Sequence, residues 1–299
     1  MFCVGYPLPA PTAQNPTDPE TYKPSDTVLR LQVLKSRVRI AMDTLGEAAW
    51  RQTVYQVMPN WTGVRAKPAS RAYYKMFEMV KTCALKNVHK SAHLAEAPGG
   101  FVQACIDLFP ELDWKVQSLA SGIKIHPSLK SGTVSTADGD LLNPDSRNAI
   151  VDAFLSSGKY DLVTADGAVE MDHSRLEESA IPLLRAEVDT AMRILSEGGT
   201  FVVKVFELAS FDTLQVVASL CGRFRSVTLI KPTLSRPTNS ERYLVCVNFR
   251  PSAPVETAIT DGWLKTVQTA VDAVCVTQCG ALEASLLDTR IPAKRRRAS

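Results

Sequence analysis

Apolar positions follow two different periods along the middle of the chain. Short apolar runs such as YDLVTA and TFVVKVF are separated by longer segments in which apolar residues recur every three or four positions. The segment 174–197 has one apolar face at helical spacing, formed by Ile181, Leu184, Val188, Met192 and Leu195. From residue 89 onward this rhythm predicts a doubly wound α/β sheet that is covered by helices on both faces.

The predicted strands, in chain order, are HLAEA, WKVQSLA, SGTVSTA, YDLVTA, TFVVKVF, SVTLI and RYLVCVNF. The last two are separated only by the polar loop KPTLSRPTNSE, which is too short for a crossover helix. They should therefore pair antiparallel. We predict a seven-stranded, mostly parallel sheet whose last strand is antiparallel.

The flanking segments differ from this core. Residues 1–24 are rich in Pro, Thr and Asn and predict a flexible arm, extended or disordered. Residues 25–62 predict an N-terminal helical extension, capped by Ser25 or Asp26. The α/β domain is expected over 63–252, and 253–299 should add one more helix and a basic tail, KRRR.

Composition narrows the class of protein. At 299 residues and 45% hydrophobic, the chain can bury a full core. We find no apolar run near the roughly 20 residues of a membrane span and no signal-peptide pattern. Seven scattered cysteines favour a reducing compartment, the cytoplasm or nucleus. Cys275 and Cys279 are one helical turn apart but lack a second ligand pair, so no metal site is predicted.

A glycine turn follows the first predicted strand. In LAEAPGGF, the residues Ala97, Pro98, Gly99 and Gly100 precede a helix that begins near Phe101. Glycines let the backbone approach a ligand, and a helix N-terminus offers free N–H groups to an anion or to hydroxyl groups. Alone, the turn is equally well explained as a structural feature.

One lysine interrupts an apolar strand. Lys204 lies within GGTFVVKVF, and an unpaired buried ammonium is unfavourable. Asp166, at the end of YDLVTAD, and Glu241, at the start of the last strand, are available as partners. The alternative to a catalytic cluster is a buried ion pair with no chemical role.

Six motifs in order resemble those of the FtsJ-like RNA ribose 2′-O-methyltransferases. They are SRAYYK, LAEAPGGF, GDLL, YDLVTADG, GGTFVVKVF and KPTLSRPTNSERYLV, between about Ser70 and Phe249. The resemblance implies a Rossmann-like methyltransferase fold that uses S-adenosylmethionine, and it places the Lys-Asp-Lys-Glu tetrad of the family on Lys75, Asp166, Lys204 and Glu241. The implied cofactor contacts are Ala97, Pro98, Gly99, Gly100, Phe101, Asp140 and Asp166, with Asp138 as a competitor of Asp140 for the adenine.

The chain departs from the family pattern at His93. Many members have Asp at this position of the strand before PGGF. A neutral His could hydrogen-bond in its place, or Glu96 could take the polar role. The second strand also lacks the terminal acid that would hold the ribose hydroxyls of the cofactor.

The chemistry implied is methyl transfer from a sulfonium to a ribose 2′-OH, with Lys204 at the 2′-oxygen. A second cation such as Lys75, at ~4 Å and an effective dielectric of ~20, would repel it by about 4 kcal/mol, which lowers a lysine pKa by roughly 3. Asp166 and Glu241 would act against this repulsion. Whether Lys204 is a base or a cationic stabiliser stays open at this point.

The implied partner is RNA, and capped mRNA is favoured because the EAPGGF form and long extensions resemble viral or eukaryotic cap enzymes. The alternatives are a ribosomal or transfer RNA substrate, and an inactive RNA-binding scaffold. The net charge of +3 is too small to decide, so the prediction rests on local residues. Candidate RNA contacts are Arg71, Tyr74, Lys231, Ser235, Arg236 and Ser240.

Overall fold

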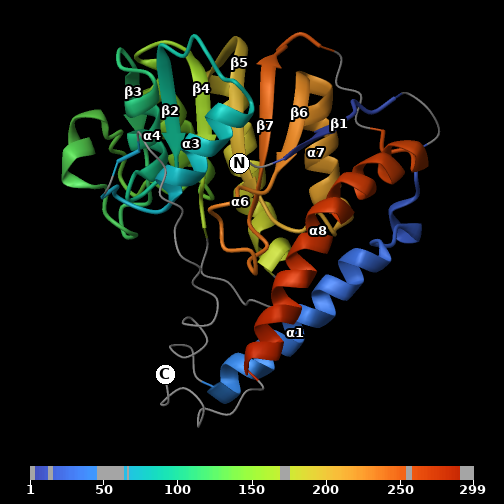
Figure 1. The fold of residues 1–299 in the computed structure, drawn as a ribbon. Helices are drawn as coiled ribbons and strands as arrows, with labels where there is room; N and C mark the ends of the chain where they lie inside the picture. The colour runs from blue at the N-terminus through green and yellow to red at the C-terminus, as the bar shows by residue number, and fades with distance from the viewer. Residues whose placement is uncertain are drawn as a thin grey trace, which may run out of the picture.

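The computed structural model describes residues 4–12, 16–45, 64–65, 67–168, 176–253 and 258–289. Its strands form one sheet with the order β1-β6-β7-β5-β4-β2-β3 (Figure 1). They are β1 (Gly5–Leu8), β2 (Lys90–Leu94), β3 (Asp113–Val116), β4 (Tyr160–Ala165), β5 (Leu195–Val205), β6 (Phe224–Ile230) and β7 (Arg242–Phe249). The pairs β2–β3, β2–β4 and β4–β5 are parallel, whereas β7 runs antiparallel to both β5 and β6.

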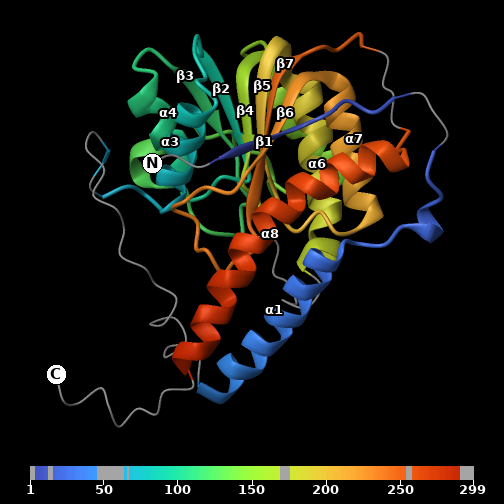
Figure 2. The same ribbon diagram turned by 45° about the vertical axis from the view of Figure 1, so that its right-hand side comes forward.

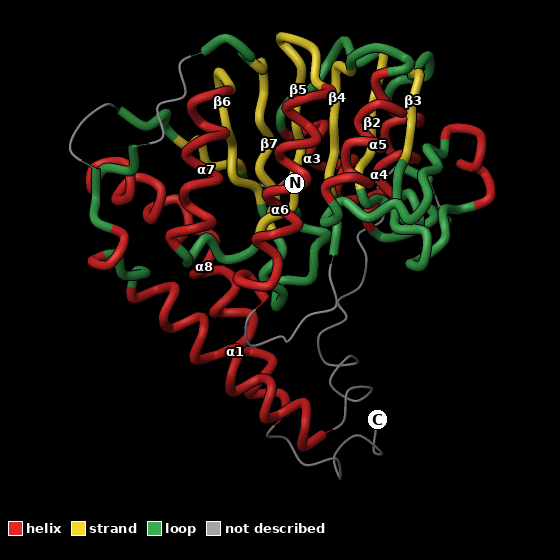
Figure 3. Tube along the Cα trace, turned by 180° about the vertical axis from the view of Figure 1, so that it is seen from behind, coloured by secondary structure: helices red, strands yellow, loops and turns green. Residues whose placement is uncertain are grey.

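Helices cover both faces of the sheet. They are α1 (Asp26–Leu45), α3 (Ala72–Thr82), α4 (Gly100–Leu108), α5 (Pro144–Leu155), α6 (Leu176–Ile194), α7 (Phe211–Arg223) and α8 (Asp261–Thr289). The helices α3 and α4 lie on one face in Figure 1, and α5, α6 and α7 lie on the other in Figure 3. The predicted doubly wound α/β fold and its antiparallel last strand are confirmed.

Alternation along the central strands produces this layering. Val163 of β4 and Val203 of β5 belong to the large apolar cluster that includes α6 and α7. Their neighbours Leu162 and Val202 belong to a second cluster, with Tyr73 of α3. Because successive side chains of a strand point to opposite faces, strands buried on both sides show the continuous apolar runs seen in the sequence.

The seventh strand is not the one predicted. The segment SGTVSTA forms no strand, and the short helix η2 (Pro127–Gly132) leads instead to a single bridge between Val116 and Thr133. Gly132 lies against the indole of Trp114, where a Cβ would come within 2.2 Å of the ring. The additional strand is β1, from the arm predicted to be flexible, and it pairs antiparallel with β6. Pro7 is compatible with β1 because that strand is at the sheet edge.

The helices α1 and α8 lie side by side and run in the same direction away from the sheet (Figure 2). Arg30 of α1 donates to Glu283 of α8 at 2.6 Å, and Trp263 Nε1 of α8 donates to the carbonyl of Pro9 at 2.8 Å. By length and composition, Asp261–Leu287 could span a membrane, a property the sequence analysis missed because charges interrupt it. Its inner residues, among them Val267 and Cys275, belong to the main apolar cluster, which accounts for this composition. The rest of the predicted helical extension, 46–62, and the KRRR tail lie outside the described residues.

Candidate active site

The helix α3 brings Lys75 to the carboxyl edge of the sheet. Buried Glu78, one turn further along α3, accepts hydrogen bonds from the backbone N–H of Thr233 at 2.9 Å and from its hydroxyl at 2.7 Å. Arg71 reaches the carbonyl of Leu234 at 3.4 Å. These contacts hold the loop 231–241 against α3, and Lys75 thereby forms an ion pair with Glu241.

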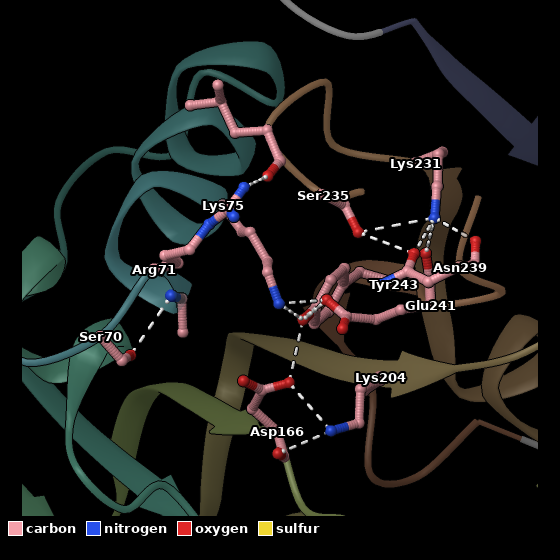
Figure 4. Close-up of polar contacts among 12 residues, drawn as sticks. Ser70, Arg71, Lys75, Asp166, Lys204, Lys231, Ser235, Asn239, Glu241 and Tyr243 are labelled. Atoms are coloured by element: carbon pink, nitrogen blue, oxygen red, sulfur yellow. Dashed lines mark hydrogen bonds and ion pairs between the residues drawn. The ribbon is translucent and has the colours of Figure 1, made fainter. Parts of the chain in front are cut away.

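The four residues predicted as a tetrad lie together around one further side chain, Tyr243 (Figure 4). Its hydroxyl is 2.6 Å from Oε1 of Glu241 and 2.9 Å from Oδ1 of Asp166, and Nζ of Lys75 approaches it at 3.4 Å. Nζ of Lys204 donates to the carbonyl of Asp166 at 2.8 Å and lies 3.2 Å from its carboxylate. The site therefore contains two lysine–carboxylate pairs joined by a tyrosine hydroxyl. Tyr243 lies within the motif ERYLV, but nothing in that motif predicts its position between the two carboxylates.

The charges of the cluster fix its protonation. Burial raises the pKa of Glu241, but Lys75 and Lys204 outweigh it and lower that pKa to about 2. Burial and the charges of Asp166 and Glu241 raise the pKa of Tyr243, so its hydroxyl keeps its proton. At neutral pH, Glu241 is an anion and Tyr243 a hydrogen-bond donor.

Lys204 is a cation in this environment. Burial acts to lower its pKa, but the charges of Asp166 and Glu241 raise it above the ordinary lysine value. The lowering expected from Lys75 does not occur, because Lys75 is paired with Glu241 and contacts Tyr243.

Glu187 is a site residue that sequence reasoning missed. It lies in the middle of α6, is 2% exposed, and accepts a hydrogen bond from the backbone N–H of Gly167 at 3.1 Å. It therefore holds the chain directly after Asp166. Burial raises its pKa to about 8, although Lys204 acts in the opposite direction. A charged residue inside an amphipathic helix gives no sequence signal of this contact.

Both glycines of the turn make room for neighbouring protein atoms. Gly99 has φ 108°, and a Cβ there would come within 2.2 Å of the Leu129 side chain. A Cβ on Gly100 would lie 2.3 Å from Oγ of Ser70 and 2.7 Å from the backbone nitrogen of Tyr73. The missing side chains thus allow α3 and the 129 region to pack closely on the turn, which places Lys75 beside it.

The polar roles left open at His93 and Glu96 are divided between the two residues. His93 is fully buried, with Nδ1 2.8 Å from the hydroxyl of Thr164 and Nε2 2.8 Å from that of Ser91. Burial lowers its pKa to about 3, so the ring is neutral. Glu96 accepts the backbone N–H of Phe101 at 2.8 Å through Oε1, and its Oε2 has no hydrogen-bond partner. His93 therefore links two strands, and Glu96 carries the polar group at the turn.

The loop after β3 is arranged by Gln117. Its Oε1 accepts the N–H of Ala95 at 3.1 Å, and its Nε2 donates to the carbonyl of Gly139 at 2.6 Å. Asp138 bonds Ser146 and accepts the N–H of Asp140 at 3.0 Å. Asp138 thus shapes the loop that carries Asp140, whose own Oδ1 accepts the N–H of Leu142 at 2.8 Å. The adenine contact of Asp140, with Asp138 as its competitor, stays a prediction.

The predicted RNA contacts fall into two groups. Ser235 and Ser240 are buried. The ammonium of Lys231 donates to the backbone carbonyl of Asn239 at 2.6 Å and to that of Glu241 at 2.8 Å. Their contacts stabilise the loop 231–241. Arg71, Tyr74 and Arg236 keep partial or full exposure on the same side of the domain, and their RNA contact stays a prediction.

A parallel sheet closed by an antiparallel strand, with paired lysines and carboxylates at its carboxyl edge, defines the class of S-adenosylmethionine-dependent methyltransferases. The sequence model of the FtsJ-like methyltransferase family matches residues 68–249, which is more than half of the chain. The chain belongs to the FtsJ-like methyltransferase family.

The names of two similar proteins state different RNA substrates, and the name of a third states none. Cap-specific mRNA (nucleoside-2′-O-)-methyltransferase 2 of Drosophila melanogaster is 30% identical over 240 residues, 71% of this chain and 33% of that protein. Ribosomal RNA large subunit methyltransferase E of Anaeromyxobacter dehalogenans is 33% identical over 164 residues, 54% of this chain and 58% of that protein. The probable methyltransferase EP424R of African swine fever virus is 26% identical over 260 residues, 73% and 61% of the two chains. The matches thus span between 33% and 61% of these relatives.

The residues present fit the cofactor of this family. S-adenosylmethionine carries two cations, the sulfonium and the α-ammonium, and one carboxylate. Near the turn the chain buries Glu96, whose Oε2 lacks a partner, and it places Asp166 and Glu187 around Lys204. A buried carboxyl oxygen without a partner suits a cationic hydrogen-bond donor of such a ligand. Among the described residues, no group of His, Cys, Asp and Glu is arranged to hold a metal ion.

Proposed function

We propose that the protein is an RNA ribose 2′-O-methyltransferase in which Lys75, Asp166, Lys204 and Glu241 act on the 2′-OH. The observation that carries the proposal is the joining of two lysine–carboxylate pairs through Tyr243. A scaffold that only bound RNA would need cations at its surface, not ammonium groups buried among carboxylates.

The cofactor supplies an activated methyl group on its sulfonium. The chain must then position the alcohol and stabilise its oxygen while the O–CH3 bond forms, the S–CH3 bond breaks and the hydroxyl proton passes to solvent water. Lys204, held by both the carbonyl and the carboxylate of Asp166, has a fixed direction and a positive charge. Its raised pKa makes it a cationic stabiliser of the 2′-oxygen rather than a base. Lys75 is fixed by Glu241 and forms the second positive point of the site.

Capped mRNA is the substrate we favour, with methylation at the first transcribed nucleotides. The cap-specific name of the Drosophila relative, which matches over 71% of this chain, supports it. The ribosomal RNA name of the Anaeromyxobacter relative supports the alternative. Either substrate places the enzyme where RNA is made or used, in the cytoplasm or nucleus.

Labelled methyl transfer tests both parts of the proposal. Capped N7-methylated RNA, uncapped RNA, ribosomal RNA and transfer RNA are offered to the wild type, Lys204→Met and Lys204→Arg. We expect incorporation into a ribose 2′-oxygen, greatest on capped RNA, and a loss of roughly 100-fold or more in Lys204→Met. Equal incorporation by wild type and Lys204→Met would contradict the mechanism. Preference for uncapped ribosomal RNA would overturn the capped-mRNA substrate and leave the proposed mechanism unchanged.

A further inference from the structure

Glu96 is a buried carboxylate whose second oxygen the protein leaves unused. The residue is 3% exposed, directly after β2, and its Oε1 caps the first turn of α4 through the N–H of Phe101. Oε2 has no hydrogen-bond partner. Burial, and after it the charge of Asp166, raise the pKa of Glu96 well above its ordinary value, so without a ligand the group holds a proton, and a bound cation would be needed to keep it as a carboxylate.

The neighbours of Glu96 are already committed to other partners. Asp166, Lys204 and Lys75 are the charged groups that act on it. Lys204 is bound to Asp166, and Lys75 to Glu241. Neither lysine donates to Glu96 in the described contacts, so a cation that ionises Glu96 would come from outside the chain.

The donor must also carry N–H or O–H groups. A sulfonium is a cation without a hydrogen-bond donor, and an adenine amino group is a donor without charge. The α-ammonium of the methionine portion is both, and only a short aliphatic chain separates it from the sulfur. Since the sulfonium methyl must be presented at Lys204 and Asp166, the ammonium belongs in their vicinity, where Glu96 lies.

We infer that Glu96 binds the α-ammonium of S-adenosylmethionine. Glu96 is then the ligand-binding acid of this turn, while His93, at the strand position where many family members have Asp, serves to connect β2 with β4. The inference deepens the proposed function at the cofactor end of the site and holds for any RNA substrate.

The substitution Glu96→Gln is the sharpest test. Glutamine keeps one acceptor oxygen for the N–H of Phe101 but has an NH2 group, which donates and does not accept, in place of Oε2, and it carries no charge. Calorimetric titration without RNA compares S-adenosylhomocysteine with its analogue that lacks the α-amino group. In the wild type, loss of the amino group should weaken binding roughly 10- to 100-fold, as for a charge-assisted hydrogen bond. In Glu96→Gln, the same loss should weaken binding about 2-fold or less.

Glu207→Gln is the matched control, because it removes a buried carboxylate that is already paired with Lys35 of α1 and is not among the charged groups that act on Glu96 or Lys204. The cost of losing the amino group should stay at its wild-type value in this control. If amino-group removal weakens binding equally in wild type and Glu96→Gln, the inference is wrong. The inference is also wrong if Glu96→Gln changes the binding cost of removing the α-carboxylate of S-adenosylhomocysteine rather than the cost of removing its α-amino group. Because no methyl is transferred, these outcomes are independent of the RNA proposal.

Discussion

The hydroxyl of Tyr243 lies 2.9 Å from Oδ1 of Asp166, which links the ends of β7 and β4 across the intervening strand β5. The same hydroxyl is 2.6 Å from Glu241. Each carboxylate also holds one lysine, so a displacement of the tyrosine would disturb both pairs. The two halves of the site are therefore mechanically connected through a group that does not itself carry charge.

Tyr243→Phe should lower the rate of methyl transfer about 10-fold, because a hydrogen bond between a buried hydroxyl and a carboxylate is lost while the ring stays packed. Single-turnover kinetics with saturating cofactor and RNA measure this rate. Tyr160→Phe is the control, since it removes a buried hydroxyl that bonds the carbonyl of Phe154 and the side chain of Ser157 and, in the described contacts, none of the four tetrad residues. A Tyr243→Phe enzyme as fast as Tyr160→Phe would show that the bridge has no catalytic effect.

Gly100→Ala should destabilise the fold by about 1–3 kcal/mol, because the new Cβ would meet the backbone nitrogen of Tyr73 at 2.7 Å. The clash moves α3 and Lys75 with it, so activity should fall more than stability alone explains. Chemical unfolding and the transfer rate are measured together. Gly280→Ala, in α8 with nothing within 4 Å of its Cβ position, should instead stabilise by about 0.5–1 kcal/mol. Equal effects of the two substitutions would contradict the packing argument.

Much of the fold followed from periodicity. The buried strands β4 and β7 were visible as apolar runs, and the short loop before β7 fixed its antiparallel direction. The strand predicted at SGTVSTA was wrong because local composition does not show that Gly132 must pack on Trp114. The strand β1 was missed since its pairing with β6 depends on residues more than 200 positions away in the sequence.

The site was predicted through ordered motifs, and its supporting contacts were not. Lys75, Asp166, Lys204 and Glu241 come together as the resemblance implied. Glu187 fixes the backbone after Asp166, and the glycine turn lets α3 pack closely. Both contacts join segments far apart in the sequence, so no local sequence pattern predicts them. The close packing of α3 on Gly100 was not predicted either, and the cofactor contact expected there stays a prediction.

Glu187 should make the folded protein less stable as pH rises. Its pKa is about 8 in the folded state, above the ordinary value of 4.5, so the folded chain binds more protons than the unfolded chain between these limits. Stability from this group is therefore present below pH 4.5 and is lost as pH rises through 8, with a slope of at most about 1.4 kcal/mol per pH unit. Urea unfolding from pH 5 to 9 should show this loss in the wild type, relative to Glu187→Gln. Parallel curves for the two proteins would mean that Glu187 is ionised throughout.

Arg236 and Lys231 should affect RNA binding in different ways, although the sequence grouped them together. Arg236 is exposed on the loop 231–241, whereas the ammonium of Lys231 is used by Asn239 and Glu241. If Arg236 contacts a phosphate, Arg236→Ala should weaken RNA binding and reduce the slope of log K against log salt by about 1. Lys231→Met should lower the melting temperature and the transfer rate and leave that slope unchanged, because the lysine orders the loop rather than neutralising a phosphate. Fluorescence anisotropy over a salt series measures both slopes. A reduced slope in Lys231→Met would show that this lysine leaves the loop and reaches the RNA.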